Sequence, residues 1–353
     1  MSRLFVHVGQ PGRVVFGAGT AGRLGDELEA LGVSRAVIVT TPGQAKLGAD
    51  FANHAGQRSA GVLPMAVMHV PVDVAADAVT RATALGADGL VAVGGGSAIG
   101  LAKAIALATG LPILAIPTTY SGSEMTPVVG TTEASEKRTV KDERVRPRTV
   151  IYDPDLTLDL PVAVSMTSGL NGMAHAVEAL CAREANPLTS LMAEEAIRAL
   201  AQGLPAIHAA PRDADARATT LYGAWLSGFV LAHVGMALHH KLCHVLGGSF
   251  NLPHAETHSV ILAHAVAYTR PAAEIALRRA DRALGGDAAT FLFDLAGRLG
   301  APRALRDLGM READLDRAAD LAVATPYWNP RPVERAGIRA LLDNAYFGRS
   351  PAA

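Results

Sequence analysis

The chain has 353 residues, of which 50% are apolar and 18% are charged, a composition that excludes a disordered protein and leaves room for two well-packed domains. Its 32 basic and 33 acidic residues give a formal charge of −1, which argues against nucleic acid or an anionic membrane as the main partner. The two cysteines, Cys181 and Cys243, are too few for a disulfide framework. Because the N-terminus lacks the apolar segment of a signal peptide, and because no apolar run reaches about 18 residues, we expect a cytoplasmic protein.

The first part of the chain alternates short β-rich runs with Ala-rich amphipathic stretches. This alternation predicts an α/β dinucleotide-binding domain with a mostly parallel sheet over residues 1–160. From about residue 161 to 353 the apolar residues recur at helical spacing, so we expect an all-α domain there. A polar, alternating segment between the two, residues 130–148, predicts a β-hairpin. The predicted strands are residues 13–16, 36–39, 66–70, 89–93, 113–116 and 149–152.

Two glycine-rich loops compete for the phosphates of a coenzyme. The loop Gly17-Ala-Gly19-Thr-Ala-Gly22 matches the G-x-G-x-x-G fingerprint between a strand and a helix. The next strand, however, ends at Thr41 without an acidic residue that would bind a ribose 2′-hydroxyl. We therefore interpret this first loop as a tight structural turn.

The second loop runs from Gly94 through Gly95 and Gly96 to Ser97, after an apolar strand and before an Ala-rich helix. Consecutive glycines let backbone N–H groups approach a pyrophosphate, and a helix N-terminus adds a partial positive charge. Lys103, in the second turn of that helix, is expected to add a full charge. We predict that this loop binds the phosphates.

A third segment, Pro117-Thr118-Thr119-Tyr-Ser121-Gly-Ser123-Glu124, follows the next predicted strand. Both segments then lie at the carboxyl ends of parallel strands, where open α/β sheets bind their ligands. We expect the hydroxyl groups of Thr118, Thr119, Ser121 and Ser123 to contact the ribose and the nicotinamide.

Several histidines in the helical part have the spacing of metal ligands. Asn171 and His175 are four residues apart on one helix face, as are His240 and His244, while His254 follows Pro253 after a turn. Three histidines with a carboxylate would form a metal site, but an amide is a poor ligand for a borderline divalent metal. We interpret His233 and His239 as bystanders and leave His258 unassigned.

These motifs resemble the iron-containing (group III) alcohol dehydrogenase superfamily over essentially the whole chain. The Gly-Gly-Gly-Ser loop at 94–97, the Thr-Thr-x-Ser-Gly-Ser-Glu segment at 118–124 and the His-x-x-x-His…Pro-His pattern at 240–254 correspond to three of its signatures, in order. The resemblance implies a dehydroquinate synthase-like fold and, as the family expectation, a homodimer. In metal-dependent members one aspartate and three histidines bind the metal, and these positions fall here on Asn171, His175, His240 and His254.

Three positions depart from the family pattern and indicate one branch of the superfamily. Asn171 replaces the aspartate, Gly100 replaces an acidic residue three positions after Ser97, and Thr41 replaces an acidic residue at the end of the second strand. With the segments 168–178 and 327–332, these features are similar to the maleylacetate reductase branch, which is described as metal-independent. The resemblance implies NADH- or NADPH-dependent reduction of maleylacetate to 3-oxoadipate in aromatic-compound catabolism, with no metal. Because Thr41 cannot repel a 2′-phosphate, we expect NADPH to be accepted beside NADH.

The chemistry of that reaction suits histidines. Hydride addition to the carbon β to the ketone leaves an enolate, which needs a hydrogen-bond donor or a cation at its oxygen. Since Asn171 and Gly100 remove negative charge, we expect an imidazolium in the cluster to stabilise the dianionic dicarboxylate substrate. The roles we assign are His244 as proton donor, His175, His240 and His254 as ligands of the enolate and of one carboxylate, and Lys241 or Arg331 as partner of the other.

Other functions stay open at this stage. The histidines also suit a metal-dependent (iron or zinc) alcohol dehydrogenase, which stoichiometric bound metal and alcohol oxidation would reveal. A lyase or a glycerol-phosphate dehydrogenase relative would need a phosphate pocket. A non-catalytic coenzyme-binding protein would bind NADH without turnover, since a fold does not fix a function.

Overall fold

The structure is a computed structural model that describes residue 7, residues 12–133 and residues 136–352. The chain divides into two compact units, Gly9–Leu160 and Pro161–Ala353, the second of which also includes His7. They are called the N-terminal unit and the helical unit below.

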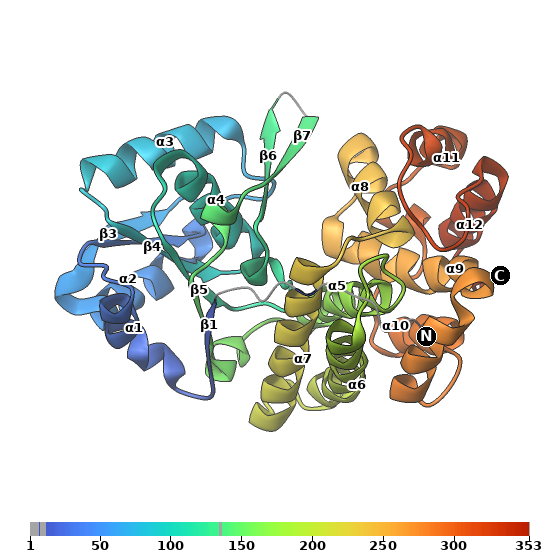
Figure 1. Cartoon of the computed structure of the whole chain (residues 1–353), viewed down its shortest axis with the longest axis horizontal. Coiled ribbons are helices and arrows are strands. Elements are labelled where there is room, and N and C mark those ends of the chain that lie inside the picture. Colours follow the sequence, from blue (N-terminus) through green and yellow to red (C-terminus); the bar gives the residue numbers. More distant parts are fainter. Residues whose placement is uncertain (1–6, 8–11, 134–135, 353) are drawn as a thin grey trace. The chain divides into compact units, whose positions relative to one another are not determined.

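A six-stranded sheet forms the centre of the N-terminal unit, and all its neighbouring strands run parallel (Figure 1). Strands β2, β4 and β5 are buried along their whole length, which explains their continuous runs of Val, Ile, Leu and Ala. The strand order is β1 (Arg13–Phe16), β8 (Thr149–Tyr152), β5 (Ile113–Pro117), β4 (Gly89–Gly94), β2 (Ala36–Thr40) and β3 (Ser59–Pro64).

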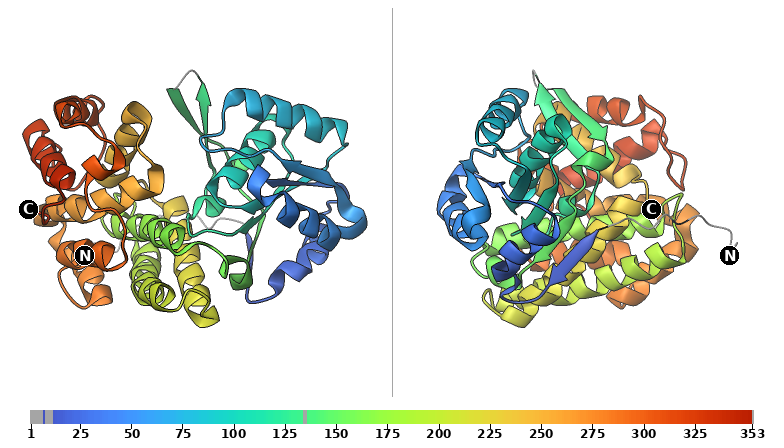
Figure 2. Two further views of the ribbon diagram at one scale, coloured as in Figure 1. Left: turned by 180° about the vertical axis from the view of Figure 1, so that it is seen from behind. Right: turned by 60° about the vertical axis from the view of Figure 1, so that its left-hand side comes forward.

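Helices cover both faces of this sheet (Figure 2). Successive side chains of a strand point to opposite faces. Ile38 of β2 therefore packs in a cluster with Leu28 and Phe51, which belong to α1 (Leu24–Ala30) and α2 (Ala45–Ala55). Its neighbour Val37 packs in the other cluster, with residues of α3 (Val72–Ala84) and α4 (Gly96–Thr109). The predicted α/β fold class is confirmed.

The segment 66–70, predicted as a strand, is not one. The strand at this place is β3, which pairs with β2 up to Pro64. Ala66 and Val70 of this segment are buried in the core cluster with residues of α3 and α4, whereas Val67 and Met68 are exposed. The backbone turns there, with left-handed φ values of 66° at His69 and 44° at Val70, just before Pro71. The other five predicted strands correspond to β1, β2, β4, β5 and β8.

The predicted hairpin is confirmed: β6 (Val128–Glu133) and β7 (Glu136–Lys141) pair in antiparallel fashion as a separate two-stranded sheet. Near its turn end the hairpin is tied to the segment before α3, because Thr132 donates backbone and side-chain hydrogen bonds to the carbonyls of Val70 and His69.

The helical unit contains no strand among its described residues, as predicted. Its helices are α5 (Val162–Leu180), α6 (Pro187–Ala209), α7 (Ala214–His233), α8 (Leu238–Phe250), α9 (His254–Leu284), α10 (Ala288–Arg298), α11 (Leu315–Val323) and α12 (Arg335–Phe347). In the described part of the chain no single helix has both the length and the apolarity to cross a membrane; α7 and α8 pass that test only as a pair, which is bent by 95°.

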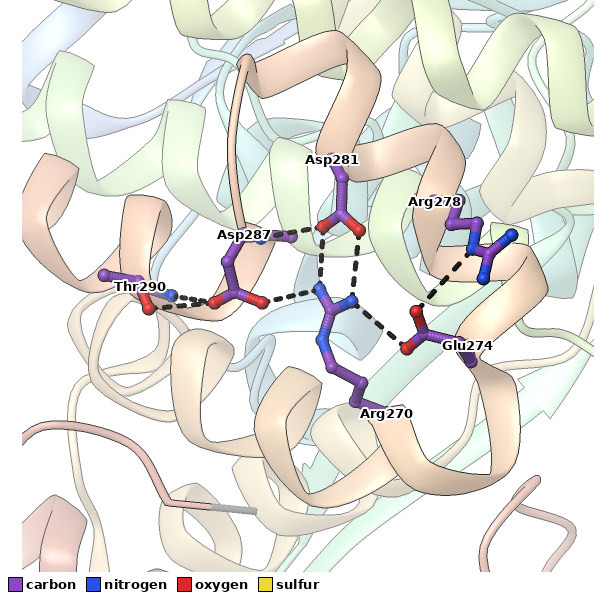
Figure 3. A network of polar contacts seen from close by, with 7 residues as sticks. Arg270, Glu274, Arg278, Asp281, Asp287 and Thr290 are labelled. Atoms are coloured by element: carbon purple, nitrogen blue, oxygen red, sulfur yellow. Dashed lines mark hydrogen bonds and ion pairs between the residues drawn. The ribbon is translucent and has the colours of Figure 1, made fainter.

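Helix α9 bends after Pro271, at Ala273, whose φ of −131° is not helical. Arg270, one residue before the proline, fastens this bend to the start of α10 (Figure 3). Its guanidinium contacts Asp281 at 2.7 Å and Asp287 at 3.0 Å, and Asp287 caps α10 by accepting from the backbone N–H of Thr290.

Candidate active site

Two predicted coenzyme loops and Thr41 meet at one edge of the sheet, where β2, β4 and β5 end. The hydroxyl of Thr41 donates to Oε1 of Gln44 at 3.2 Å, and a Cβ on Gly94 would lie 2.9 Å from that same oxygen. The backbone N–H of Thr118 donates to the carbonyl of Gly94 at 3.1 Å. These loops therefore form one surface at the carboxyl ends of the strands, as predicted.

The three glycines of the second loop differ in what they allow. A Cβ on Gly95 would lie 2.9 Å from Thr119 Cγ2, so glycine here lets the two loops pack closely. Gly96 is exposed, and no atom lies within 4 Å of where its Cβ would be. Gly96 begins α4, and the residue before it caps the helix without any side chain. The N-terminus of α4, next to Ser97, is thus open to an anion.

Lys103 does not face this anion site, so its predicted role is wrong. Its side chain is fully buried, and Nζ donates to the carbonyls of Ser123 (2.6 Å), Thr126 (2.9 Å) and Val128 (2.9 Å) and to the Thr126 hydroxyl. Burial lowers the pKa of Lys103, and the Glu124 carboxyl opposes that shift. Lys103 instead anchors the segment that follows Ser121, because α4 presents its apolar face inward at this position.

The first glycine loop is a structural turn, as interpreted from the sequence. The carboxylate of Asp153 accepts from the backbone N–H groups of Gly19 at 3.1 Å and Ala21 at 2.8 Å. A protein carboxylate therefore takes the N–H groups that would otherwise bind a pyrophosphate.

A steric contact explains why position 100 is a glycine. A Cβ at this position would lie 2.9 Å from Cγ2 of Val70, the residue with the left-handed backbone. The Val70 side chain thus occupies the space that a side chain at position 100 would need. A left-handed β-branched residue is strained, and such strain is commonly found at functional sites.

The histidines come together from three packed helices of the helical unit. Helix α5 carries Asn171 and His175, α8 carries His239, His240 and His244, and α9 begins at His254. Asn171 is buried, and its Oδ1 has no hydrogen-bond partner among the described residues.

A hydrogen-bonded chain runs through the cluster and includes a carboxylate that was not predicted. Nδ1 of His175 lies 2.7 Å from Nε2 of His240, and the two rings stack with centroids 4.7 Å apart. Nδ1 of His240 lies 2.5 Å from Oε2 of Glu178, while Oε1 of Glu178 accepts from the backbone N–H of His239 at 2.7 Å. Glu178 thereby also satisfies the N-terminus of α8, which has no capping side chain of its own.

Sequence reasoning also missed two imidazoles. His239, interpreted as a bystander, is buried, and its Nε2 donates to the carbonyl of His258 at 3.2 Å. His258 is fully buried, with ring centroids 4.7 Å from His239, 5.0 Å from His240 and 4.3 Å from His254. Neither nitrogen of His258 has a hydrogen-bond partner among the described residues. The signal was present, since His258 lies one turn after His254 on the same helix.

The pKa values of three buried histidines bear on the expectation of an imidazolium in the cluster. Burial lowers the pKa of His239 to about 4, and burial together with neighbouring imidazoles takes the pKa values of His240 and His258 well below the usual range. These three rings are therefore neutral at pH 7. We had expected the cluster to have no acidic group, but the carboxyl of Glu178 contacts His240. Burial raises the pKa of this carboxyl.

In this arrangement the facing nitrogens of His175 and His240 lie closer together than two ligands of one metal. One ring nitrogen each of His239, His240 and His258 lie within 4.8 Å of one another, a spacing that a metal site would need to contract. Nε2 of His240 faces His175, and Nδ1 meets Glu178, a carboxylate contact that the second nitrogen of a metal-bound histidine commonly makes. Two nitrogens bound to one tetrahedral zinc lie roughly 3.3 Å apart, from Zn–N distances of about 2.0–2.1 Å, whereas those of His175 and His240 are 2.7 Å apart. A direct contact between His240 and the substrate stays a prediction.

The remaining predicted residues are His244, His254, Lys241 and Arg331. His244 is exposed on α8, with its ring 6.3 Å from that of His240, and His254 is half-buried. Lys241 is half-buried, with Nζ 5.7 Å from the centre of the Tyr327 ring. Arg331 donates to the carbonyl of Tyr268 at 2.9 Å and stacks on that ring, so its guanidinium has a structural role that the sequence did not reveal.

Comparison with known proteins agrees with both units. The model of the iron-containing alcohol dehydrogenase family matches residues 11–154, and the C-terminal model of the Fe-containing alcohol dehydrogenase family matches residues 165–346. A maleylacetate reductase from Burkholderia cepacia is 55% identical over 340 residues, which cover 96% of this chain and 97% of that protein. Crystal structures of maleylacetate reductases from Agrobacterium tumefaciens (52% identity) and Rhizobium sp. strain MTP-10005 (51%) each superpose with a TM-score of 0.96, covering 99% of this chain and 99% and 100% of theirs. The chain belongs to the iron-containing alcohol dehydrogenase family.

Proposed function

We propose that this chain is an NAD(P)H-dependent oxidoreductase that reduces the carbon–carbon double bond of maleylacetate to give 3-oxoadipate, and that it does so without a metal. The main support for this substrate is that more than half of the residues are identical to those of a maleylacetate reductase over almost the whole chain. The amide at Asn171 and the 2.7 Å contact between Nδ1 of His175 and Nε2 of His240 support the metal-free part, because an amide is a poor ligand and the two nitrogens are closer than ligands of one metal.

The N-terminal unit holds the nicotinamide coenzyme in this proposal. Phosphates bind at the open N-terminus of α4, where Gly96 leaves space and backbone N–H groups point outward. Thr118, Thr119, Ser121 and Ser123 contact the ribose and the nicotinamide. When bound, the coenzyme supplies the hydride. No acidic side chain stands at Thr41, so both NADH and NADPH serve.

The helical unit supplies the proton and stabilises charge. Reduction at the carbon β to the ketone places negative charge on the ketone oxygen, which His175 stabilises by a hydrogen bond. His244, which is exposed and therefore exchanges protons with water, protonates the α carbon. His254 and Lys241 bind the carboxylates of the substrate. We further propose that the protein works as a cytoplasmic homodimer without nucleic acid or membrane partners.

The test is a steady-state assay of the purified protein with maleylacetate and each coenzyme, with the product identified by mass and by NMR. We expect oxidation of one NADH or NADPH per 3-oxoadipate formed, with the ketone retained. A product in which the ketone is reduced to an alcohol, or coenzyme binding without turnover, would refute the proposal.

The family itself favours one alternative, a metal-dependent alcohol dehydrogenase. It requires simple alcohols to be oxidised by NAD(P)⁺ in the presence of added iron or zinc. The amide at Asn171 and the short contact between His175 and His240 argue against it. The same preparation, assayed with alcohols and either metal, separates the two functions.

A further inference from the structure

Residues 327–332 form a segment that is fixed to helices α8 and α9 of the helical unit. Oδ1 of Asn329 accepts from the backbone N–H of Leu238, the first residue of α8, at 3.3 Å. Arg331 donates to the carbonyl of Tyr268 on α9 at 2.9 Å, and its guanidinium lies 4.2 Å from the centre of the Tyr268 ring. The segment therefore has a defined position beside the start of α8.

Tyr327, the first residue of this segment, lies against Lys241 of α8. Nζ of Lys241 stands over the Tyr327 ring, 5.7 Å from its centre. An ammonium within about 6 Å of an aromatic ring is attracted by the negative face of the ring. Because the segment is held by other residues, the ring offers the flexible lysine side chain a fixed support.

The ammonium of Lys241 is available to a ligand. The side chain is half-buried, and no described residue accepts a hydrogen bond from Nζ or pairs with it as an ion. By contrast, four oxygens lie within hydrogen-bond distance of Nζ of Lys103. An ammonium has three donors, and a carboxylate is the partner that such a charge binds most strongly.

Two further observations define what the ring and the lysine do. The Tyr327 hydroxyl is buried without a hydrogen-bond partner among the described residues, so the face of the ring is the part of this side chain that meets Lys241. His244 follows Lys241 by three residues on α8, so both side chains lie on one face of that helix. His244 is the proton donor in the proposed function.

We propose that Tyr327 is a positioning residue that holds the ammonium of Lys241 beside His244, where it binds one carboxylate of the substrate and selects a dicarboxylate over a monocarboxylate. Tyr327 acts through Lys241 and does not itself touch the substrate. This inference rests on the proposed function and adds a residue that determines its specificity. Since the carboxylate keeps its charge during the reaction, the contact contributes equally to binding of the substrate and of the transition state.

The position of the ammonium is measured by NMR of the Lys241 side chain, which needs no turnover. The chain has five lysines, and the signal that is missing from K241M identifies Lys241. The ring current of Tyr327 should displace the ε-proton signal of Lys241 upfield in the native protein and in Y327F, which keeps an aromatic ring, but not in Y327L. A signal without this displacement in the native protein would overturn the proposal, even if Y327L failed to fold.

The ligand is tested with two probes of equal length, adipate with two carboxylates and hexanoate with one. Titration of each probe, followed by NMR, gives its affinity. We expect the native protein to bind adipate at least about tenfold more tightly than hexanoate, and the two affinities to converge in K241M. Equal affinities in the native protein, or the same preference in K241M, would refute a carboxylate site at Lys241.

The kinetic readout separates positioning from a structural role. In Y327L the KM for maleylacetate should rise roughly three- to tenfold, the worth of a cation–π contact, while kcat stays unchanged. In K241M the KM should rise at least about tenfold, and adding Y327L to K241M should raise it no further. The matched control is W328L, which changes the next aromatic residue, an exposed one, and should keep the native KM.

The outcomes distinguish this inference from the proposed function. Additive effects of Y327L and K241M on KM, or an equal rise of KM in W328L, would overturn the role of Tyr327. A displaced Lys241 signal and a preference for adipate, in a native protein that never turns over maleylacetate, would refute the proposed function alone.

Discussion

Asn171 sets the chemistry of the histidine cluster at the scale of a single residue. It lies on the same face of α5 as His175, four residues away, and its Oδ1 is buried without a hydrogen-bond partner among the described residues. A carboxylate there would add a negative charge close to Glu178. In the function proposed above, the amide avoids a negative charge that would repel a dianionic substrate.

Replacing Asn171 by Asp should therefore create a metal site and impair reduction. We expect N171D to bind about one zinc or iron per chain, because three imidazoles with a carboxylate form the usual donor set, and to lose at least about tenfold in kcat through repulsion of the substrate. Metal analysis after dialysis and steady-state kinetics measure both effects. The control N171A, which removes the amide without adding charge, should stay free of metal. Full reductase activity in metal-free N171D would contradict the role given to the amide.

At the scale of elements, α4 connects the phosphate loop with the segment that ends β5. Its first residues follow directly on the Gly94–Gly95 loop, and Nζ of Lys103 in its second turn lies within hydrogen-bond distance of four oxygens of residues 123–128. The helix thus orders both coenzyme loops at once. This explains why a lysine lies within an apolar run of Leu101, Ala102, Ala104 and Ile105, which are all buried.

The variant K103M tests this anchor, since methionine has a similar length but no donor. Each buried acceptor left unpaired costs roughly 1–3 kcal/mol, so we expect the free energy of unfolding to fall by about 3 kcal/mol or more. The affinity for NADH should fall as well, because the segment 118–124 loses its support. Urea unfolding and coenzyme titration by fluorescence measure these effects. K46M, at an exposed position of α2, should change neither; a K103M protein of native stability would argue against the anchor.

At the scale of the whole molecule, the sequence predicted the fold well because its strands are continuously apolar. The exception is residues 66–70, which have the apolar composition of a strand but a turning backbone, with Ala66 and Val70 buried and Val67 and Met68 exposed. A composition that reports burial cannot by itself tell a strand from a buried turn.

The candidate site was only partly predictable. Spacing pointed to Asn171 with His175 and to His240 with His244, because the members of each pair are one turn apart on one helix. The roles of Glu178 and Lys103 depend on contacts between elements, which local spacing does not encode. His240 illustrates the difference: its position suited a metal ligand, but its hydrogen-bond partners lie on another helix.

The most direct test of the account is to measure metal content and maleylacetate turnover on one preparation, before and after exhaustive treatment with a chelator. We predict far less than one iron or zinc ion per chain, and the same kcat with NADH before and after treatment. A kcat that collapses on chelation and returns when iron or zinc is added would contradict reduction by a metal-free histidine site.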